Sequence, residues 1–264
     1  IGDFVLRRAD GVPVFFFCNA VDDALMGVSH VLRGEDHLAN TPRQRLLLEA
    51  LGLPAPAYGH LPLVLGADGA PLSKRRGAAS LAALRSRGFL PGAVLNYLLR
   101  LGHAGAPDGW LEPAAMPGHF DLGQVGRSPA HFDEAQLLHW QREAVRRLDE
   151  AACAEWLAPA LSGPLGPAER GRLAALLRHT LLFPAEAQPW IPVLTGGPLA
   201  PDRTAREALA RAGAGYFAAA RDAFGTSGAD LAALARELRA RTGLKGAALY
   251  PPLRAALTGR CDGP

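Results

Sequence analysis

The most informative stretch of this chain is VSHVLRGEDHLANTPRQR, residues 28–45. It opens with a β-branched run over residues 28–32, which favours a buried strand. A polar cluster, RGEDH at residues 33–37, follows at the predicted carboxyl end of that strand. Ligands bind at this edge in open α/β sheets. The stretch therefore predicts one strand of an α/β sheet with ligand-binding groups at its end.

A helix is predicted directly after the polar cluster. Thr41 is a suitable N-cap, Pro42 suits the first helical position, and Gln44 completes a Thr-x-x-Gln capping box. Gly52 is expected to end the helix after Leu51. This pattern gives the strand a helical continuation, as an α/β unit requires.

Outward from this stretch, the chain changes character near residue 78. The apolar runs at Asp3–Arg8, Pro13–Cys18 and Leu61–Leu65 predict further strands. Beyond them, helical spacing predicts helices at Ser80–Arg87, Pro91–Leu101 and Asp133–Leu148, a loop-rich segment at 103–127, and a helical last third. The predicted fold class is therefore α/β followed by all-α.

Composition limits the classes of function. The 264 residues are 49% hydrophobic and 20% charged with a net charge of +3, so the chain permits a nucleic-acid partner without requiring one. The three cysteines show no CxxC spacing, which predicts reduced thiols, a cytoplasmic location and no zinc or other metal site. No apolar run reaches about 18 residues, so no membrane span is expected.

Several sequence blocks occur in an ordered series. They are VSHVLRGEDHLANTPRQR at 28–45, PLSKRRG at 71–77, GFLP at 88–91, LNY at 95–97, SPAHFD at 128–133, YPPLR at 250–254 and ALTGR at 256–260. Together they resemble the catalytic domain and following helices of bacterial-type glutamyl-tRNA synthetases of class I. The resemblance covers almost the whole chain and is weakest at about residues 150–240. Ordered blocks are far more specific than one short motif.

The resemblance implies a fold and an activity. It implies the second half of a Rossmann-like catalytic domain at 1–75, a helical stem-contact region at 76–150, and an incomplete helical anticodon-binding domain at 151–264. The family uses ATP and Mg²⁺ to make glutamyl-adenylate, and then transfers glutamate to tRNA(Glu). The first step requires positioning and neutralisation of phosphate charge.

An ATP site is implied at two places. Ser73, Lys74 and Arg75 match the family's mobile phosphate-binding loop, with Lys74 as the catalytic cation, while Leu63 and Val64 match residues that flank the adenine. A solvated surface loop is the alternative for residues 73–75, and strand packing is the alternative for Leu63 and Val64. The loop departs from the family pattern because proline stands at position 71, where lysine is usual, and arginine at 76, where histidine is common.

A glutamate site is implied by three residues. Arg33 matches an arginine that pairs with a substrate carboxylate, and a guanidinium can bind a carboxylate through two parallel hydrogen bonds. Its alternative is an intramolecular ion pair with Glu35 or Asp36. Asn19 matches an asparagine near the substrate, with a structural hydrogen bond as its alternative. Phe15 stands where the family usually has tyrosine, so a hydroxyl is lost there.

Contacts with tRNA are predicted less sharply. Arg43 and Arg45 on the predicted helix are candidates, as are the arginines beyond residue 140. Trp140 and Trp156 have the aromatic character to stack on bases. Trp140, however, lies at helical spacing within apolar residues, which favours a place in the core.

The family's His-Ile-Gly-His-like motif is not in this sequence. Both ends have the look of cuts through a larger protein, so the expected partners include an N-terminal catalytic half, and the full-length protein is expected to be monomeric. The chain alone is expected not to activate glutamate. A different class remains open: a truncated, non-catalytic paralogue that binds tRNA or a partner protein.

Two related enzyme types fit the sequence less well. The helical region at 130–264 argues against a glutamyl-queuosine enzyme, which lacks it. The same region argues against a glutaminyl-tRNA synthetase, whose C-terminal part is a β-barrel, because no strand-rich pattern follows residue 130. Glutamate therefore remains the amino acid that the resemblance favours.

Overall fold

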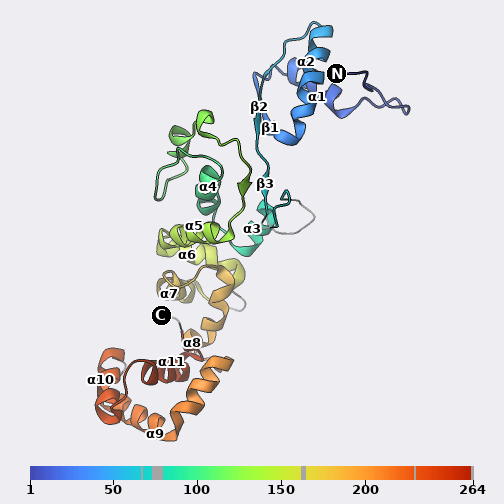
Figure 1. The fold of residues 1–264 in the computed structure, drawn as a ribbon. Helices are drawn as coiled ribbons and strands as arrows, with labels where there is room; N and C mark the ends of the chain where they lie inside the picture. Colours follow the sequence, from blue (N-terminus) through green and yellow to red (C-terminus); the bar gives the residue numbers. More distant parts are fainter. Residues whose placement is uncertain (67, 73–79, 162–164, 229, 263–264) are drawn as a thin grey trace. The chain divides into compact units, whose positions relative to one another are not determined.

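The computed structural model describes residues 1–66, 68–72, 80–161, 165–228 and 230–262, drawn in full colour in Figure 1. They form two compact units. The first unit comprises Ile1–Leu84 and Pro91–Trp140, and the second comprises Arg85–Leu90 and Gln141–Pro264.

The first unit begins with a small α/β arrangement. Its elements are α1 (Phe15–Leu25), β1 (His30–Gly34), the 3-10 helix η1 (Glu35–Asn40), α2 (Thr41–Ala50) and β2 (Ala57–Leu61). Strands β1 and β2 are parallel, and their register pairs Arg33 with His60. Parallel strands need a crossover connection, and α2 provides it. Helix α2 packs on α1, burying Ala20, Leu47 and Leu48.

The predicted strand at 13–18 is wrong, because helix α1 begins at Phe15. A short apolar run looks the same in a strand and in a buried helix, and here the helix continues for 11 residues and buries Ala20 against α2. Residues 3–8 form no regular strand either; only Arg7 makes an isolated bridge, to Pro13.

The apolar run at 61–65 is divided between two strands. Strand β2 ends at Leu61, and the short β3 (Val64–Leu65) pairs instead with β4 (Ala130–His131). Pro62 lies between them and has no backbone N–H to continue the ladder.

Helix α2 does not have the predicted capping box. It begins at Thr41 after Asn40, which makes no side-chain capping bond. The side chains of Thr41 and Gln44 instead form hydrogen bonds with residues distant in the sequence. The predicted end is confirmed, since Gly52 adopts φ 67°, a left-handed conformation that favours glycine.

The rest of the first unit is mainly helix and loop. It contains α3 (Leu81–Arg87), α4 (Pro91–Arg100), η3 (Met116–His119), η4 (Leu122–Gln124) and α5 (Glu134–Arg146), of which α3 and α5 extend beyond its limits. Buried Asn96 bonds to Gly92 and to both the backbone N–H and C=O of Leu111, and so anchors the predicted loop segment on α4. Asp133 caps α5 by accepting from the Ala135 and Gln136 N–H groups.

The described residues of the second unit form no strands, which confirms the predicted all-helical end. Its elements are α6 (Glu150–Leu157), η5 (Ala158–Ala160), α7 (Pro167–Leu177), η6 (Pro184–Trp190), α8 (Ile191–Thr195), α9 (Arg203–Ser227), α10 (Leu231–Thr242), η7 (Gly246–Ala248) and α11 (Tyr250–Thr258). One apolar cluster centres on Leu157, Leu173 and Leu177. A second centres on Leu238 and Leu253, where α9, α10 and α11 meet. Among the described helices, none is both long and apolar enough to cross a membrane.

Among the described glycines of the second unit, Gly88 leaves the least room for a Cβ atom. Its φ is +93°, and a Cβ there would lie 2.4 Å from the Cδ of Pro184. Its carbonyl accepts hydrogen bonds from Gln141 Nε2 at 3.2 Å and Trp156 Nε1 at 2.9 Å. The backbone therefore has little room to shift without breaking these bonds.

We expect Gly88→Ala to lower the free energy of unfolding by about 2 to 4 kcal/mol, from left-handed strain plus the clash. Gly171→Ala is the matched control, since no atom lies within 4 Å of its Cβ and it sits inside α7. Alanine there should stabilise by about 0.5 to 1 kcal/mol. Urea unfolding measures the free energy of unfolding of both variants. Equal changes in the two would contradict the tight packing described at Gly88.

Candidate functional site

The candidate site lies at the carboxyl end of β1, around Arg33. Registered residues on parallel neighbours point to the same face, and side chains alternate along each strand. Because Arg33 pairs with His60, Arg33, Tyr58 and His60 share one face of the two-stranded sheet. Helix α2 brings Thr41 and Gln44 to the same place.

The Arg33 guanidinium is held by neutral groups. Its Nη2 donates to Thr41 Oγ1 at 2.7 Å and to Gln44 Oε1 at 2.6 Å, with the His37 carbonyl at 3.5 Å. The guanidinium carbon lies 5.1 Å from the centre of the Tyr58 ring, a cation–π contact. Its Nε is buried and has no hydrogen-bond partner among the described residues.

No carboxylate among the described residues pairs with Arg33. Glu35 accepts from the Leu63 N–H at 3.4 Å, and Asp36 lies 3.8 Å from His37 Nε2. The intramolecular ion pair considered from the sequence is therefore not formed. A half-buried guanidinium with neutral partners keeps its full charge available for an anionic ligand.

Tyr58 adds a second polar atom without a partner. Its hydroxyl is buried and makes no hydrogen bond to any described residue. Burial raises the pKa of Tyr58, and the nearby Arg33 charge opposes this more weakly. The phenol is therefore neutral near pH 7 and can both donate and accept a hydrogen bond.

Asn19 is brought into the same network. Its Oδ1 accepts from Gln44 Nε2 at 3.2 Å, so Asn19 and Arg33 are linked through one side chain. Phe15 is 62% exposed, and the centre of its ring lies 5.8 Å from that of the His37 ring. Phe15 therefore lies beside the polar cluster with most of its surface open to solvent.

Thr41, Gln44 and Tyr58 are site residues that the sequence pattern does not reveal. The spacing of Thr41 and Gln44 predicts a capping box instead. A usable signal was nonetheless present, since Gln44, Leu47 and Leu48 recur at helical spacing and all three are buried. A buried amide requires hydrogen-bond partners, and those of Gln44 are Arg33, Asn19 and the Phe16 carbonyl.

The predicted ATP residues are only partly described. Ser73, Lys74 and Arg75 lie outside the described residues. Leu63 and Val64 are half-buried, and the Val64 carbonyl accepts from the Leu72 N–H at 2.8 Å. Within the described ranges, no cluster of three or more His, Cys, Asp or Glu side chains is placed to hold a metal ion.

The two predicted tRNA-contacting arginines of α2 differ in environment. The Arg43 guanidinium carbon lies 5.8 Å from the centres of both the Phe4 and Phe16 rings. Arg45 is exposed. Arg43 is therefore engaged in packing, and Arg45 presents its charge to solvent.

The two tryptophans considered for base stacking are engaged internally. Trp140 is 7% exposed and the Arg100 guanidinium carbon lies 4.0 Å from its ring centre, which confirms its predicted place in the core. The Trp156 indole N–H donates to Gly88.

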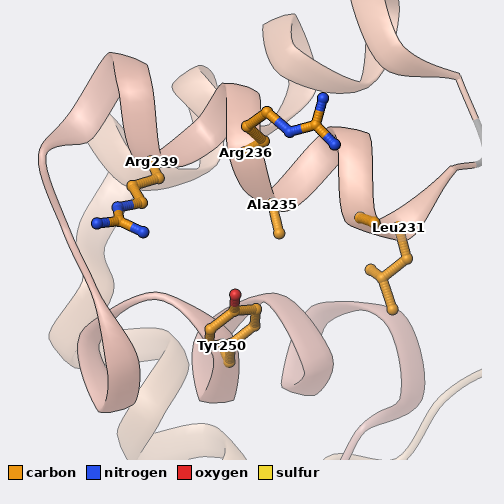
Figure 2. Close-up of a pocket in the computed structure, with 6 residues that line it drawn as sticks. Leu231, Ala235, Arg236, Arg239 and Tyr250 are labelled. Atoms are coloured by element: carbon orange, nitrogen blue, oxygen red, sulfur yellow. The ribbon is translucent and has the colours of Figure 1, made fainter.

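A basic pocket lies in the second unit. It is a hollow of about 500 Å³ lined by Leu231, Ala232, Ala235, Arg236, Arg239 and Tyr250. Figure 2 shows Arg236 and Arg239 on α10, with Tyr250 across from them at the start of α11. Both arginines are exposed, and the pocket therefore combines two cations with an aromatic ring.

Comparison with known proteins identifies the family. Residues 1–137 match the family model of the class I tRNA synthetases (E and Q), catalytic domain. The chain belongs to this family. The family and the fold class predicted from the sequence are thereby confirmed.

Curated relatives of this chain are named glutamate–tRNA ligases. It is 52% identical over 265 residues to glutamate–tRNA ligase 2 of Acidithiobacillus ferrooxidans. That alignment covers 100% of this chain and 55% of the relative. It is 50% identical over 264 residues to glutamate–tRNA ligase 2 of Nitrosococcus oceani, covering 100% of the chain and 56% of that protein. The chain spans about half the length of the curated relatives it matches.

Solved structures show the same fold. A glutamate tRNA ligase from Elizabethkingia meningosepticum, solved in complex with its amino acid, matches this chain over 100% of its length and over 58% of its own. The TM-score is 0.76 at 24% sequence identity. This likeness supports the fold only.

The contrast between Arg43 and Arg45 generates a prediction. Arg43→Ala should lower the free energy of unfolding by about 1 kcal/mol, because it removes contacts with two aromatic faces. Arg45→Ala, on the same helix, should change it by less than about 0.5 kcal/mol. Thermal unfolding of the two variants measures this. A larger loss at Arg45 than at Arg43 would contradict the assignment.

Proposed function

We propose that this chain forms part of a larger enzyme that joins glutamate to tRNA(Glu) with ATP, through glutamyl-adenylate. The observation that carries the proposal is the Arg33 guanidinium, held in place by neutral groups and left without a carboxylate among the described residues. Family membership and about 50% identity to glutamate–tRNA ligases support it. Free glutamate carries two carboxylates, and a preset cation suits one of them.

The proposed chemistry has two steps. The α-carboxylate of glutamate attacks the α-phosphate of ATP, and pyrophosphate leaves. A ribose hydroxyl at the 3′ end of the tRNA then attacks the carbonyl, and AMP leaves. Mg²⁺ enters with the ATP phosphates as part of the substrate. Charge builds on the phosphates in the first step, and cations placed there lower the barrier.

The proposed roles of the ATP residues follow the family resemblance. Lys74 neutralises the phosphates, assisted by Ser73 and Arg75, and its compact ammonium can follow pyrophosphate as it leaves. Leu63 and Val64 flank the adenine. Their half-buried place at the start of β3 is compatible with one apolar wall of such a site.

The proposed amino-acid site combines donors from two elements. Arg33 binds a glutamate carboxylate, and Asn19 lies within the same hydrogen-bond network. Phe15 supplies an apolar surface without a hydroxyl. The unpartnered Tyr58 hydroxyl offers a hydrogen bond that Phe15 does not.

The helical parts are proposed to bind tRNA. Residues 76–150 would contact the stem and residues 151–264 the anticodon side. Arg236 and Arg239 suit phosphates, and the Tyr250 ring suits a stacked base. The remaining proposed partner is an N-terminal catalytic half, within a monomeric, cytoplasmic enzyme.

Arg33→Lys should raise the KM for glutamate by about 30-fold or more. A lysine has a single nitrogen, so it cannot keep the Thr41 and Gln44 bonds and also donate to a carboxylate from a second nitrogen, a loss of about 2 kcal/mol or more. The KM for ATP should change less than about twofold. Steady-state charging of tRNA(Glu) by the full natural protein measures both, with Arg45→Lys as the control.

An unchanged glutamate KM in Arg33→Lys would remove Arg33 from the site. A full natural protein that binds tRNA(Glu) but never charges it would favour the non-catalytic paralogue instead. The proline at position 71 and the phenylalanine at 15 are the observations that favour that second function.

The double substitution Arg236→Ala with Arg239→Ala should weaken tRNA(Glu) binding and reduce the slope of log Kd against log salt by about 2. Each phosphate contact contributes about one unit to that slope. Arg221→Ala is the control, since this α9 arginine is 81% exposed and pairs with its neighbour Asp222. Filter binding across a salt series measures the slope. An equal change of the slope in Arg221→Ala would contradict a specific phosphate site at the pocket, because any exposed arginine would then contribute as much.

A further inference from the structure

Gln44 occupies an unusual position for an amide. It is 0% exposed, on the face of α2 that also buries Leu47 and Leu48. Its side chain makes hydrogen bonds to three residues: Arg33, Asn19 and the carbonyl of Phe16. These partners come from β1 and α1, so one buried amide joins three elements of the fold.

The orientation of the Gln44 amide is fixed by its partners. Arginine can only donate, so the Gln44 oxygen must face Arg33 Nη2, at 2.6 Å. The Gln44 NH₂ must then face the other way. There it meets the Phe16 carbonyl, which can only accept, at 3.2 Å. Both partners require the same orientation.

The orientation of Asn19 follows from that of Gln44. The Gln44 NH₂ also points at Asn19, which must therefore present its own oxygen, at 3.2 Å. The Asn19 NH₂ is consequently directed away from Gln44 as a hydrogen-bond donor. A donor suits a carboxylate ligand, whereas an amide oxygen in the same place would repel one.

Gln44 also restricts which nitrogen atoms of Arg33 can donate to a carboxylate ligand. The two N–H bonds of Nη2 are directed at Gln44 and Thr41. A bidentate geometry that uses Nη2 would compete with these bonds, which leaves Nη1 and Nε for a ligand. Nε is buried and without a partner among the described residues. The carboxylate is therefore received mainly at Nη1.

We propose that Gln44 is a positioning residue that sets the arrangement of donors for the amino-acid substrate, acting through Arg33 and Asn19. It does not touch the substrate itself. The inference rests on the proposed function, because glutamate is the anion that these donors would receive. Gln44 thereby determines that the site offers N–H groups rather than oxygens to a carboxylate.

Gln44→Glu reverses this arrangement while nearly preserving shape. A carboxylate still accepts from Arg33 but cannot donate to Asn19 or Phe16. The Asn19 amide would then turn its NH₂ toward the new carboxylate and its oxygen toward the ligand. The added negative charge would also compete with substrate for the Arg33 guanidinium.

Gln141 provides a matched control. It is also 0% exposed, and it accepts from the Leu90 N–H at 2.9 Å and donates to the Gly88 and Leu182 carbonyls. Its partners are all backbone groups of the second unit, so it holds the chain together without orienting any proposed ligand-binding side chain.

The test uses the full natural protein and steady-state charging of tRNA(Glu). Gln44→Glu should raise the KM for glutamate by about tenfold or more and leave the KM for ATP and for tRNA within about twofold. Gln141→Glu should lower the melting temperature without changing the glutamate KM. Gln44→Met, which keeps the length and removes the hydrogen bonds, should also raise the glutamate KM selectively.

The outcomes separate this inference from the proposed function. A wild-type protein that does not charge tRNA with glutamate would overturn both. An active wild type with an unchanged glutamate KM in folded Gln44→Glu or Gln44→Met would overturn the positioning role alone. Equal changes in the KM values for glutamate, ATP and tRNA would also overturn it. So would failure of both Gln44 variants to fold, since in either case the role of Gln44 would be structural.

Discussion

The hydrogen bonds from Arg33 Nη2 to Thr41 and Gln44 are the constraint on which the candidate site depends. They tie the end of β1 to α2, and Gln44 extends the connection to α1 through Asn19. Because the partners are neutral, the guanidinium is fixed in direction without losing its charge. Binding an anion then requires little further ordering of the side chain, which is the advantage of a preorganised site.

Much of the fold was predictable because its signals are local. Gly52, Gly88 and Gly102 all adopt positive φ where helices were predicted to end, and the helical spacing beyond residue 130 is confirmed by a second unit without strands among its described residues. Arg33 was recognisable as a candidate site residue because a polar cluster at a strand end is also a local pattern. These features need no knowledge of distant contacts.

The errors arose where distant contacts decide the structure. The apolar run at 13–18 fits a strand or a buried helix equally, and only packing of α1 on α2 favours the helix. Thr41 and Gln44 match a capping box in the sequence, but Arg33 and Asn19, 11 and 25 residues from Gln44, take their hydrogen bonds instead. A charged donor in a half-buried place outcompetes a backbone N–H that water can satisfy.

A structure of the full natural protein with bound glutamate would show whether Arg33 receives a substrate carboxylate. We expect a glutamate carboxylate at Arg33, with the Nη2 bonds to Thr41 and Gln44 retained and the Asn19 NH₂ facing the ligand. A glutamate bound elsewhere, or an Arg33 side chain that leaves Thr41 and Gln44 to pair with Glu35 or Asp36, would contradict it.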